Sequence, residues 1–175
     1  MPDEAKVHPQ IGCCGIDCVL CPRYYTEGSS RCPGCAGPDF HLKHPTCTFV
    51  TCCHKQRGLE VCAECPDFPC ARFARETGDR DSFVTHRRVL PNQYAIQSGG
   101  LAKFLEQQQR RRAFLETALT RFNDGRSKNL YCLAAALLTP ASLEDTLAKA
   151  TDSANLKELL RKYAEEQGDE LKLRK

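Results

Sequence analysis

The sequence predicts a mainly α-helical protein in which an irregular cysteine-rich metal-binding module packs on a small helical bundle. Twelve of the thirteen cysteines fall between residues 13 and 70, a stretch without a long helical pattern. Beyond residue 100, apolar residues recur at three- and four-residue steps, as in amphipathic helices. We therefore expect a cysteine-rich module over residues 11–75, a helical bundle over residues 76–170, and flexible termini at residues 1–10 and 171–175.

The cysteines have to supply cross-links, because loop-rich chain without a large apolar core cannot offset its conformational entropy by hydrophobic burial alone. A separation of two residues lets one tight turn direct two sulfurs at one ion, in zinc sites and in iron–sulfur proteins. Six cysteines are paired in this way: Cys18 and Cys21, Cys32 and Cys35, Cys62 and Cys65. The first ten residues lack the apolar run of a secretory leader, so we expect a cytoplasmic protein with metal thiolates rather than disulfides.

The first cysteine motif, residues 14–22, reads Cys-Gly-Ile-Asp-Cys-Val-Leu-Cys-Pro. The same cysteine spacing occurs in radical S-adenosylmethionine enzymes, but the strand and helix repeats of their barrel do not follow here. The prolines after Cys21 and Cys65 are typical of iron–sulfur ligation, where the last cysteine of a run precedes proline.

The second motif, Cys32-Pro33-Gly34-Cys35, is typical of zinc sites. Gly34 permits the positive φ of a knuckle whose backbone amides point at sulfur. His41, His44 and Cys47 follow at three-residue intervals. A single loop histidine is more often solvated or hydrogen-bonded than ligating, so His41, His44 and also His54 stay outside the expected ligand set.

These motifs, together with Cys-Ala-Glu-Cys-Pro-Asp-Phe-Pro-Cys at residues 62–70, resemble a cysteine-rich family of domains of unknown function, number 3795 in that series. The resemblance covers roughly residues 12–75, and it implies metal binding without implying a reaction. The pattern of the family leaves Cys13 and Cys53 as extra cysteines. It falls on Cys14, Cys18, Cys21, Cys32, Cys35, Cys47, Cys52, Cys62, Cys65 and Cys70.

The spacing leaves open which thiols share an ion and which metal they bind. Zinc is our expectation, and an iron–sulfur cluster is the alternative. One partition joins the thiols of residues 14–21 to a cysteine of residues 62–70. It leaves a second group of Cys32, Cys35, Cys47 and Cys52.

The second half of the chain predicts a series of helices. Short helical turns are also expected between residues 48 and 59. Thr139 and either Asp152 or Ser153 are suitable N-caps for the last two helices. Cys132 stands alone in an apolar helix and is expected to be a small core residue. The expected helices span residues 71–77, 82–89 (ending before Pro91), 92–98, 101–122, 129–138, 141–150 and 153–167.

Charge and motifs limit the function. The net charge of +3 is too mild for a typical nucleic-acid binder, and Arg110, Arg111 and Arg112 are expected on an exposed helix face. No stretch is apolar enough to predict a membrane helix, and no phosphate-binding loop or nucleophile elbow occurs. We therefore expect a binding or scaffold module with several structural zinc sites, an unidentified protein partner and no catalytic residues. The alternative is an iron–sulfur protein with a redox role.

Overall fold

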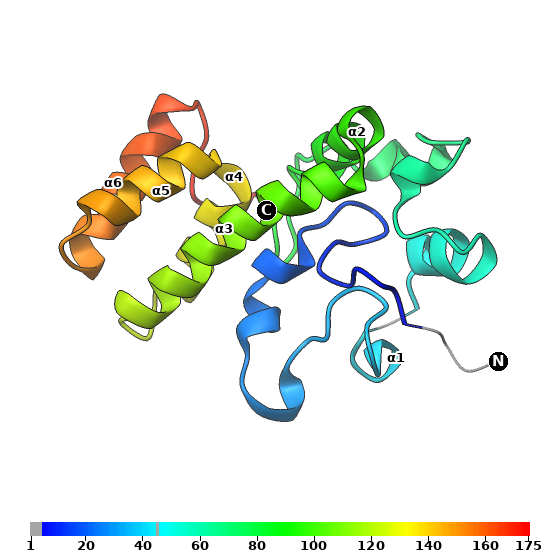
Figure 1. Cartoon of the computed structure of the whole chain (residues 1–175), viewed down its shortest axis with the longest axis horizontal. Coiled ribbons are helices and arrows are strands. Elements are labelled where there is room, and N and C mark those ends of the chain that lie inside the picture. Colours follow the sequence, from blue (N-terminus) through cyan, green and yellow to red (C-terminus); the bar gives the residue numbers. More distant parts are fainter. Residues whose placement is uncertain (1–4, 45) are drawn as a thin grey trace.

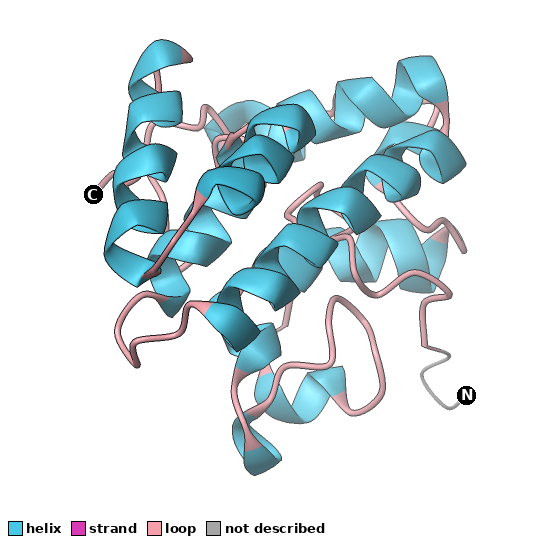
Figure 2. Ribbon diagram, turned by 60° about the vertical axis from the view of Figure 1, so that its left-hand side comes forward, coloured by secondary structure: helices cyan, strands magenta, loops and turns pink. Residues whose placement is uncertain are grey.

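The computed structural model describes residues 5–44 and 46–175, and this part of the chain forms helices and turns without strands. Figure 1 shows the cysteine-rich first half, in blue and cyan, on one side of the long diagonal helix α3 (Leu101–Arg121). The last helices lie on the other side. Figure 2 shows helices joined by loops, and no strand in the described part of the chain. The predicted mainly α-helical class is confirmed.

The cysteine-rich half is built from single turns. It contains the α-helical turn α1 (Phe40–Lys43), and the helical turns expected between residues 48 and 59 include the π-helix η4 (Val50–Gln56). The helix expected at residues 71–77 is a 3₁₀-helix, η6 (Ala71–Arg75). The remaining 3₁₀ turns are η1 (Cys18–Leu20), η2 (Pro22–Tyr25), η3 (Gly28–Ser30) and η5 (Cys62–Glu64).

Four of the expected long helices are present within a residue or two of their predicted ends. They are α3 and, after it, α4 (Lys128–Leu137), α5 (Pro140–Lys149) and α6 (Ser153–Glu166). Thr139 caps α5 by accepting a hydrogen bond from the backbone N–H of Ser142 at 3.2 Å. Asp152 caps α6 in the same way through the N–H of Asn155, at 2.9 Å.

The prediction of a helix at residues 82–89 that ends before Pro91 is wrong. Residues 82–88 form bends and turns, because the carboxylate of Asp81 accepts hydrogen bonds from the Thr85 hydroxyl at 3.1 Å and the His86 N–H at 2.7 Å. Helix α2 (Val89–Gly99) then includes Pro91 as its third residue. A proline is tolerated there because the first N–H groups of a helix have no partner within the helix.

The main core is formed by the four helices α3, α4, α5 and α6, together with the 3₁₀ turn η1. Val19 and Leu20 of η1, each 1% exposed, pack with Leu115 and Leu156 of the helices. Cys132 is 2% exposed in the same cluster, as expected of a small core residue. The domain boundary expected near residue 75 stays a prediction. Apolar residues from both sides of it pack in the same core cluster.

The two ends of the described chain are hydrogen-bonded to the rest of the molecule. Asp81 and Arg174 form an N–H to carbonyl bond of 2.8 Å, and the buried guanidinium of Arg87 pairs with Asp169. At the other end, the N–H groups of Val7 and His8 donate to the Glu60 carboxylate at 2.9 Å each. Flexibility of residues 171–175 and 5–10 stays a prediction, whereas residues 1–4 lie outside the described part.

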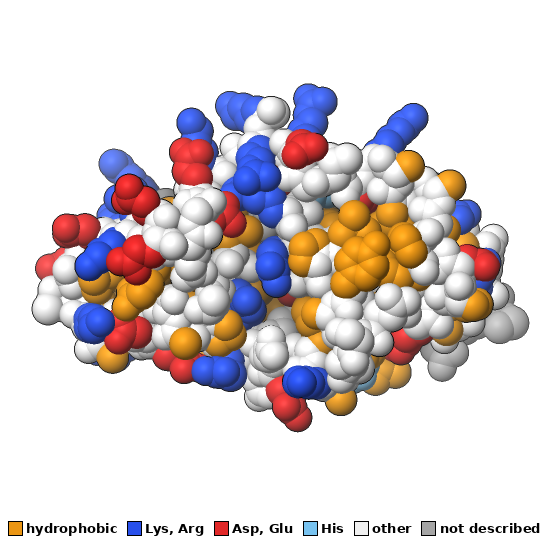
Figure 3. Space-filling model, turned by 90° about the horizontal axis from the view of Figure 1, so that it is seen from above, with side chains coloured by type: hydrophobic (Ala, Val, Ile, Leu, Met, Phe, Trp, Pro, Cys, Tyr) orange, Lys and Arg blue, Asp and Glu red, His pale blue; other side chains and the backbone are white. Residues whose placement is uncertain are grey.

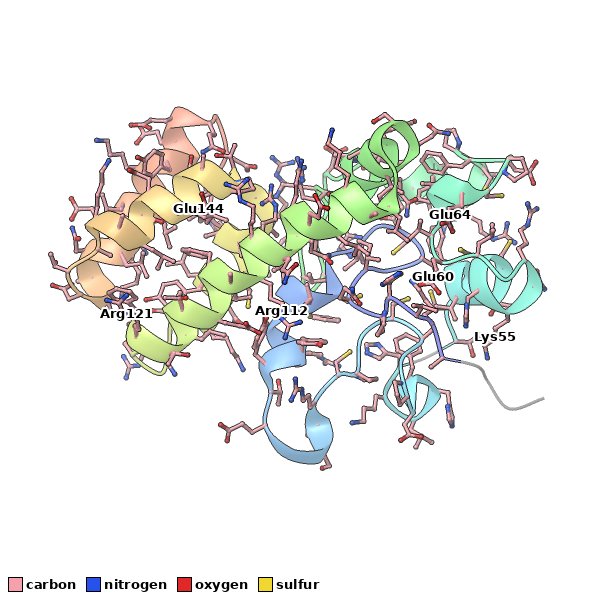
Figure 4. The ribbon with its side chains drawn as sticks, in the orientation of Figure 1. Lys55, Glu60, Glu64, Arg112, Arg121 and Glu144 are labelled. Carbon is pink, nitrogen blue, oxygen red and sulfur yellow. The ribbon has the colours of Figure 1, made fainter. Side chains whose placement is uncertain are left out.

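The three consecutive arginines of α3 are engaged within the fold. Arg110 pairs with Glu144 at 2.7 Å and Arg112 with Glu116 at 2.8 Å. Figure 4 shows Arg112 and Glu144 on α3 and α5. Arg111 differs from the expected exposed position, because it donates to the carbonyls of residues 135, 136 and 138 at the end of α4. Among the described residues, no helix combines the length and apolar character that crossing a membrane requires.

Candidate metal centre

Two of the three closely spaced cysteine pairs enclose a single 3₁₀ turn. The N–H of Cys21 donates to the carbonyl of Cys18 at 3.2 Å, and the N–H of Cys65 donates to that of Cys62 at 3.0 Å. Side chains three residues apart eclipse each other in a 3₁₀ turn. The backbone therefore brings the two cysteines of each pair to one side of the chain.

The third pair, Cys32 and Cys35, has a different geometry. The N–H of Cys32 donates to the carbonyl of Arg23 at 3.0 Å, whereas that of Cys35 donates to the carbonyl of Pro9 at 2.8 Å. Gly34 has the expected positive φ, 89°, and a Cβ there would lie 2.3 Å from the Pro9 oxygen. The two thiols consequently have different neighbours: Cys35 contacts Cys13, and Cys32 contacts His44.

Five thiols, which we call the inner thiols, form a connected group in the interior. The sulfurs of Cys13 and Cys35 are 3.9 Å apart, and the N–H of Cys13 donates to the Cys35 sulfur at 3.4 Å. Cys35 also contacts the thiol of Cys18, and Cys53 contacts those of Cys13 and Cys62. Figure 4 shows the sulfur atoms of this half, in yellow, on the right-hand side of the molecule. The inner thiols are Cys13, Cys18, Cys35, Cys53 and Cys62.

The inner thiols favour negative charge at two of their members. Hydrogen bonds from Cys13 and Cys18 hold the pKa of Cys35 well below its usual range. Those from Cys13 and Cys62 lower the pKa of Cys53 in the same way. The corresponding contacts raise the pKa of Cys13, because its proton is shared with Cys35 and then with Cys53.

A buried lysine provides a positive charge beside this group. Lys6 is 4% exposed, and its ammonium donates to the carbonyl of Ile11 at 2.7 Å. Its backbone N–H donates to the carbonyl of Ala36, the residue after Cys35, at 3.0 Å. The ammonium acts on the thiols of Cys13, Cys18, Cys35 and Cys53, and in each case it favours the thiolate.

A cavity of about 70 Å³ adjoins the inner thiols. Three phenylalanines, Phe49, Phe68 and Phe73, enclose it together with Arg57, which donates to the Cys65 sulfur at 2.8 Å and to Asp67 at 2.7 Å. The thiols around it come from η4, from η5 and the residue after it, and from the residue before η6. They are Cys52, Cys53, Cys62, Cys65 and Cys70.

The remaining predicted ligands, Cys14, Cys21 and Cys47, lie around these groups. Burial raises the pKa of Cys14 to about 12, although the N–H of Ile16 donates to its sulfur. Burial also raises the pKa of Cys21, against hydrogen bonds from the N–H groups of Arg23 and Tyr24. Cys47 is half-buried, three residues before the start of η4.

Buried amide side chains attach the cysteine loops to the helices. Gln93, 0% exposed, accepts from the N–H of Ala63 at 2.5 Å and donates to the carbonyl of Cys13 at 2.8 Å. Asn92 and Gln108 donate to the two carboxylate oxygens of Asp17 at 2.8 and 2.9 Å. Helices α2 and α3 thus position the turns that carry the cysteines.

The cysteine sulfurs are donors that suit a thiophilic metal. The structure brings them close in pairs and does not arrange them as a complete coordination shell. Two sulfurs bound to one zinc ion at 2.3 Å are about 3.8 Å apart, close to the 3.9 Å between Cys13 and Cys35. Within residues 5–44 and 46–175, no group of three or more His, Cys, Asp or Glu side chains is arranged to hold an ion. The predicted ligand set therefore stays a prediction.

Sequence reasoning missed four side chains that the structure brings to this region: Cys13, Cys53, Lys6 and His44. Two of them are in doublets, Cys13-Cys14 and Cys52-Cys53, and the residue of each doublet that lies outside the family pattern is the more deeply buried. The apolar residue Ile11, two positions before the first doublet and 0% exposed, was a signal that the chain beside this doublet is core. Nothing in the spacing singled out Lys6.

Comparison with known families agrees with the sequence pattern. Residues 10–75 match the family model described as protein of unknown function (DUF3795). The match covers the cysteine-rich part of the chain and does not extend into α2 or the helices after it. This confirms the resemblance seen in the cysteine motifs, and the description of the DUF3795 family assigns no activity. No curated protein and no solved structure shows a significant match to the chain.

Proposed function

We propose that the cysteine-rich half of the chain binds metal ions through cysteine thiolates and that its principal metal is zinc in a structural role. The observation that carries the proposal is the 3.9 Å separation of the Cys13 and Cys35 sulfurs inside a group of five contacting thiols. Sulfur donors favour zinc or iron–sulfur clusters over hard cations. A structural ion would supply the folding free energy that single turns and loops lack.

The charges around the inner thiols support the same proposal. Four thiolates around one Zn²⁺ carry a net charge of about −2. The buried ammonium of Lys6 offsets part of that charge, which costs a great deal to bury without a partner. The thiols that ionise most readily, Cys35 and Cys53, both contact Cys13.

The test is the metal content of protein purified under anaerobic, reducing conditions with zinc supplied. We expect the purified protein to hold zinc tightly. Removing the zinc with a chelator should unfold the cysteine-rich half, and circular dichroism and amide hydrogen exchange measure this unfolding. Cys13→Ala should lower the zinc content, whereas Cys132→Ala, which changes an equally buried thiol in the helical core, should not. Compact protein after exhaustive chelation, or thiols recovered as disulfides, would contradict the proposal.

A second candidate is an iron–sulfur cluster, favoured by the cavity of about 70 Å³ that five cysteines line. The volume of this cavity exceeds the roughly 15 Å³ that one water molecule needs. Hydrogen bonds to the sulfurs tune the potentials of such clusters, and Arg57 already donates to Cys65. Visible absorption with iron and inorganic sulfide in the anaerobic protein would favour this candidate over zinc, and colourless zinc-loaded protein would exclude it.

A further inference from the structure

The side chain of His44 faces a cysteine outside the inner thiols. Its Nε2 lies 3.1 Å from the sulfur of Cys32, a residue that is 9% exposed. The ring is stacked on Phe40, with centroids 4.5 Å apart and planes 12° from parallel. The backbone of His44 is fixed as well, because its N–H donates to the carbonyl of Phe40 at 3.0 Å as the cap of α1. His44 is therefore held with one ring nitrogen directed at sulfur.

A second thiol, that of Cys21, belongs to the same region of the chain. Two backbone N–H groups, those of Arg23 and Tyr24, donate to the Cys21 sulfur at the start of η2. This is the arrangement of a zinc knuckle, in which amides stabilise a thiolate. The N–H of Cys32 donates to the Arg23 carbonyl at 3.0 Å, so the turn that follows Cys21 is joined to the backbone of Cys32.

We propose that Cys21, Cys32 and His44 bind a further zinc ion, separate from the inner thiols. This inference rests on the proposed function of the domain. A sulfur and an imidazole nitrogen on one tetrahedral zinc ion are about 3.6 Å apart, so the observed 3.1 Å requires a separation of only about half an ångström more. The thiol of Cys21 would then move toward the pair, because the ion needs at least a third protein ligand.

The charge of this site differs from that of the inner thiols. Two thiolates and a neutral imidazole cancel the charge of Zn²⁺, so the site needs no buried counter-charge. Three protein ligands also leave a fourth position for water or another donor, as in zinc sites that remain open to small ligands. The chemical class of the ligand is a divalent, thiophilic cation, and zinc is the member that the mixed sulfur and nitrogen donors favour.

The test compares His44→Ala with His41→Ala, the exposed histidine of the same short helix. Zinc per chain is measured by elemental analysis on the reduced protein. We expect His44→Ala to lose one zinc ion per chain, His41→Ala to keep the wild-type content, and Cys32→Ser combined with His44→Ala to lose no more than either change alone. His44→Cys should restore the ion and increase the sulfur-to-metal charge-transfer absorption of the cobalt-substituted protein.

The outcomes separate the two proposals. Wild-type protein that binds no metal overturns the proposed function and this inference together. Wild-type protein that binds zinc, with an unchanged zinc content in His44→Ala, overturns this inference alone. A loss that His44→Cys does not restore also overturns it, because histidine would then act through folding and not as a ligand.

Discussion

The side chain of Gln93 and the backbone of Cys13, 80 positions apart in the sequence, are joined by a buried hydrogen bond of 2.8 Å. The other end of the same amide accepts from Ala63, in the turn that carries Cys62 and Cys65. One residue of α2 thereby fixes the separation of two cysteine loops. Any metal centre assembled from both loops depends on this amide for its geometry.

Gln93→Ala should destabilise the protein by about 2–6 kcal/mol, because it leaves a buried carbonyl and a buried N–H without partners, at about 1–3 kcal/mol each. The free energy of unfolding in urea measures the effect. Gln97→Ala, on the exposed face of the same helix, is the matched control and should change it by less than about 0.5 kcal/mol. Equal effects of the two changes would show that Gln93 does not hold the loops.

Arg111→Met should lower the free energy of unfolding by about 2 kcal/mol, because the carbonyls at the end of α4 lose a charged donor. Arg112→Met removes an exposed ion pair with Glu116 and should cost no more than about 0.5 kcal/mol. Thermal unfolding of the two variants side by side distinguishes a structural cap from a surface charge. If the order were reversed, the capping role would be wrong.

Asp81→Asn should make stability less sensitive to acid. Burial opposes ionisation of Asp81, but hydrogen bonds from the N–H groups of Arg174 and His86 outweigh it, together with the Thr85 hydroxyl and Arg87, and lower the pKa of Asp81. A carboxylate whose pKa is depressed in the folded state stabilises the protein above its unfolded pKa, about 3.9, and loses that contribution as the pH falls through the folded value.

The difference in unfolding free energy between wild type and Asp81→Asn should therefore be full at pH 7 and shrink below about pH 4. Urea unfolding at a series of pH values measures it. Taking the difference removes acid effects common to both proteins, such as loss of metal. Asp79→Asn, in the exposed part of the same loop, is the control. A difference that grows as the pH falls would contradict the assignment.

Lys6→Met should weaken zinc binding by roughly 10- to 100-fold, the usual effect of a lost outer-shell partner, because the thiolates lose their buried counter-charge. Competition with a chromophoric chelator measures the affinity. Lys6→Arg, which keeps the charge, should restore much of it. Lys103→Met, on the exposed face of α3, should leave the affinity unchanged. Equal affinities of wild type and Lys6→Met would remove the electrostatic role of Lys6.

The long helices could be predicted because their sequence signals are local. The apolar steps of α3, the Thr139 cap and the Asp152 cap each act within a few residues. Pro91 was misjudged because proline ends a helix at one position and begins it at another. Here the start of the helix depends on Asp81, because its hydrogen bonds to Thr85 and His86 hold the residues before Val89 in turns.

The cysteine region could be predicted in its chemistry and only partly in its arrangement. Spacing identifies the turns at Cys18 and Cys62, since both are closed by bonds within four residues. It does not reveal that Cys32 and Cys35 have different neighbours, because their backbones bond to Arg23 and Pro9. Contacts between distant segments decide those neighbours, and no local pattern encodes them.

The positions of the apolar side chains outside the core also depend on the fold. Figure 3 shows an apolar area on the face seen from above, on the side where α2 and the cysteine-rich half lie, with charged side chains of both signs around it. Tyr94 of α2, 47% exposed, makes an edge contact with Phe68. The sequence places Tyr94 on a helix, and only the structure shows that its ring contacts Phe68, one of the residues that line the cysteine-lined cavity.

The reliance of the cysteine turns on Asn92, Gln93 and Gln108 has a consequence for synthesis on the ribosome. The residues that match the family end at position 75, but the amides that bond to the Cys13 carbonyl and the Asp17 carboxylate follow up to 33 positions later in the chain. While the nascent chain still holds α2 and α3 in the exit tunnel, the emerging thiols cannot reach their final positions. Any early capture of metal would therefore occur on an open chain, and later helix docking would have to rearrange it.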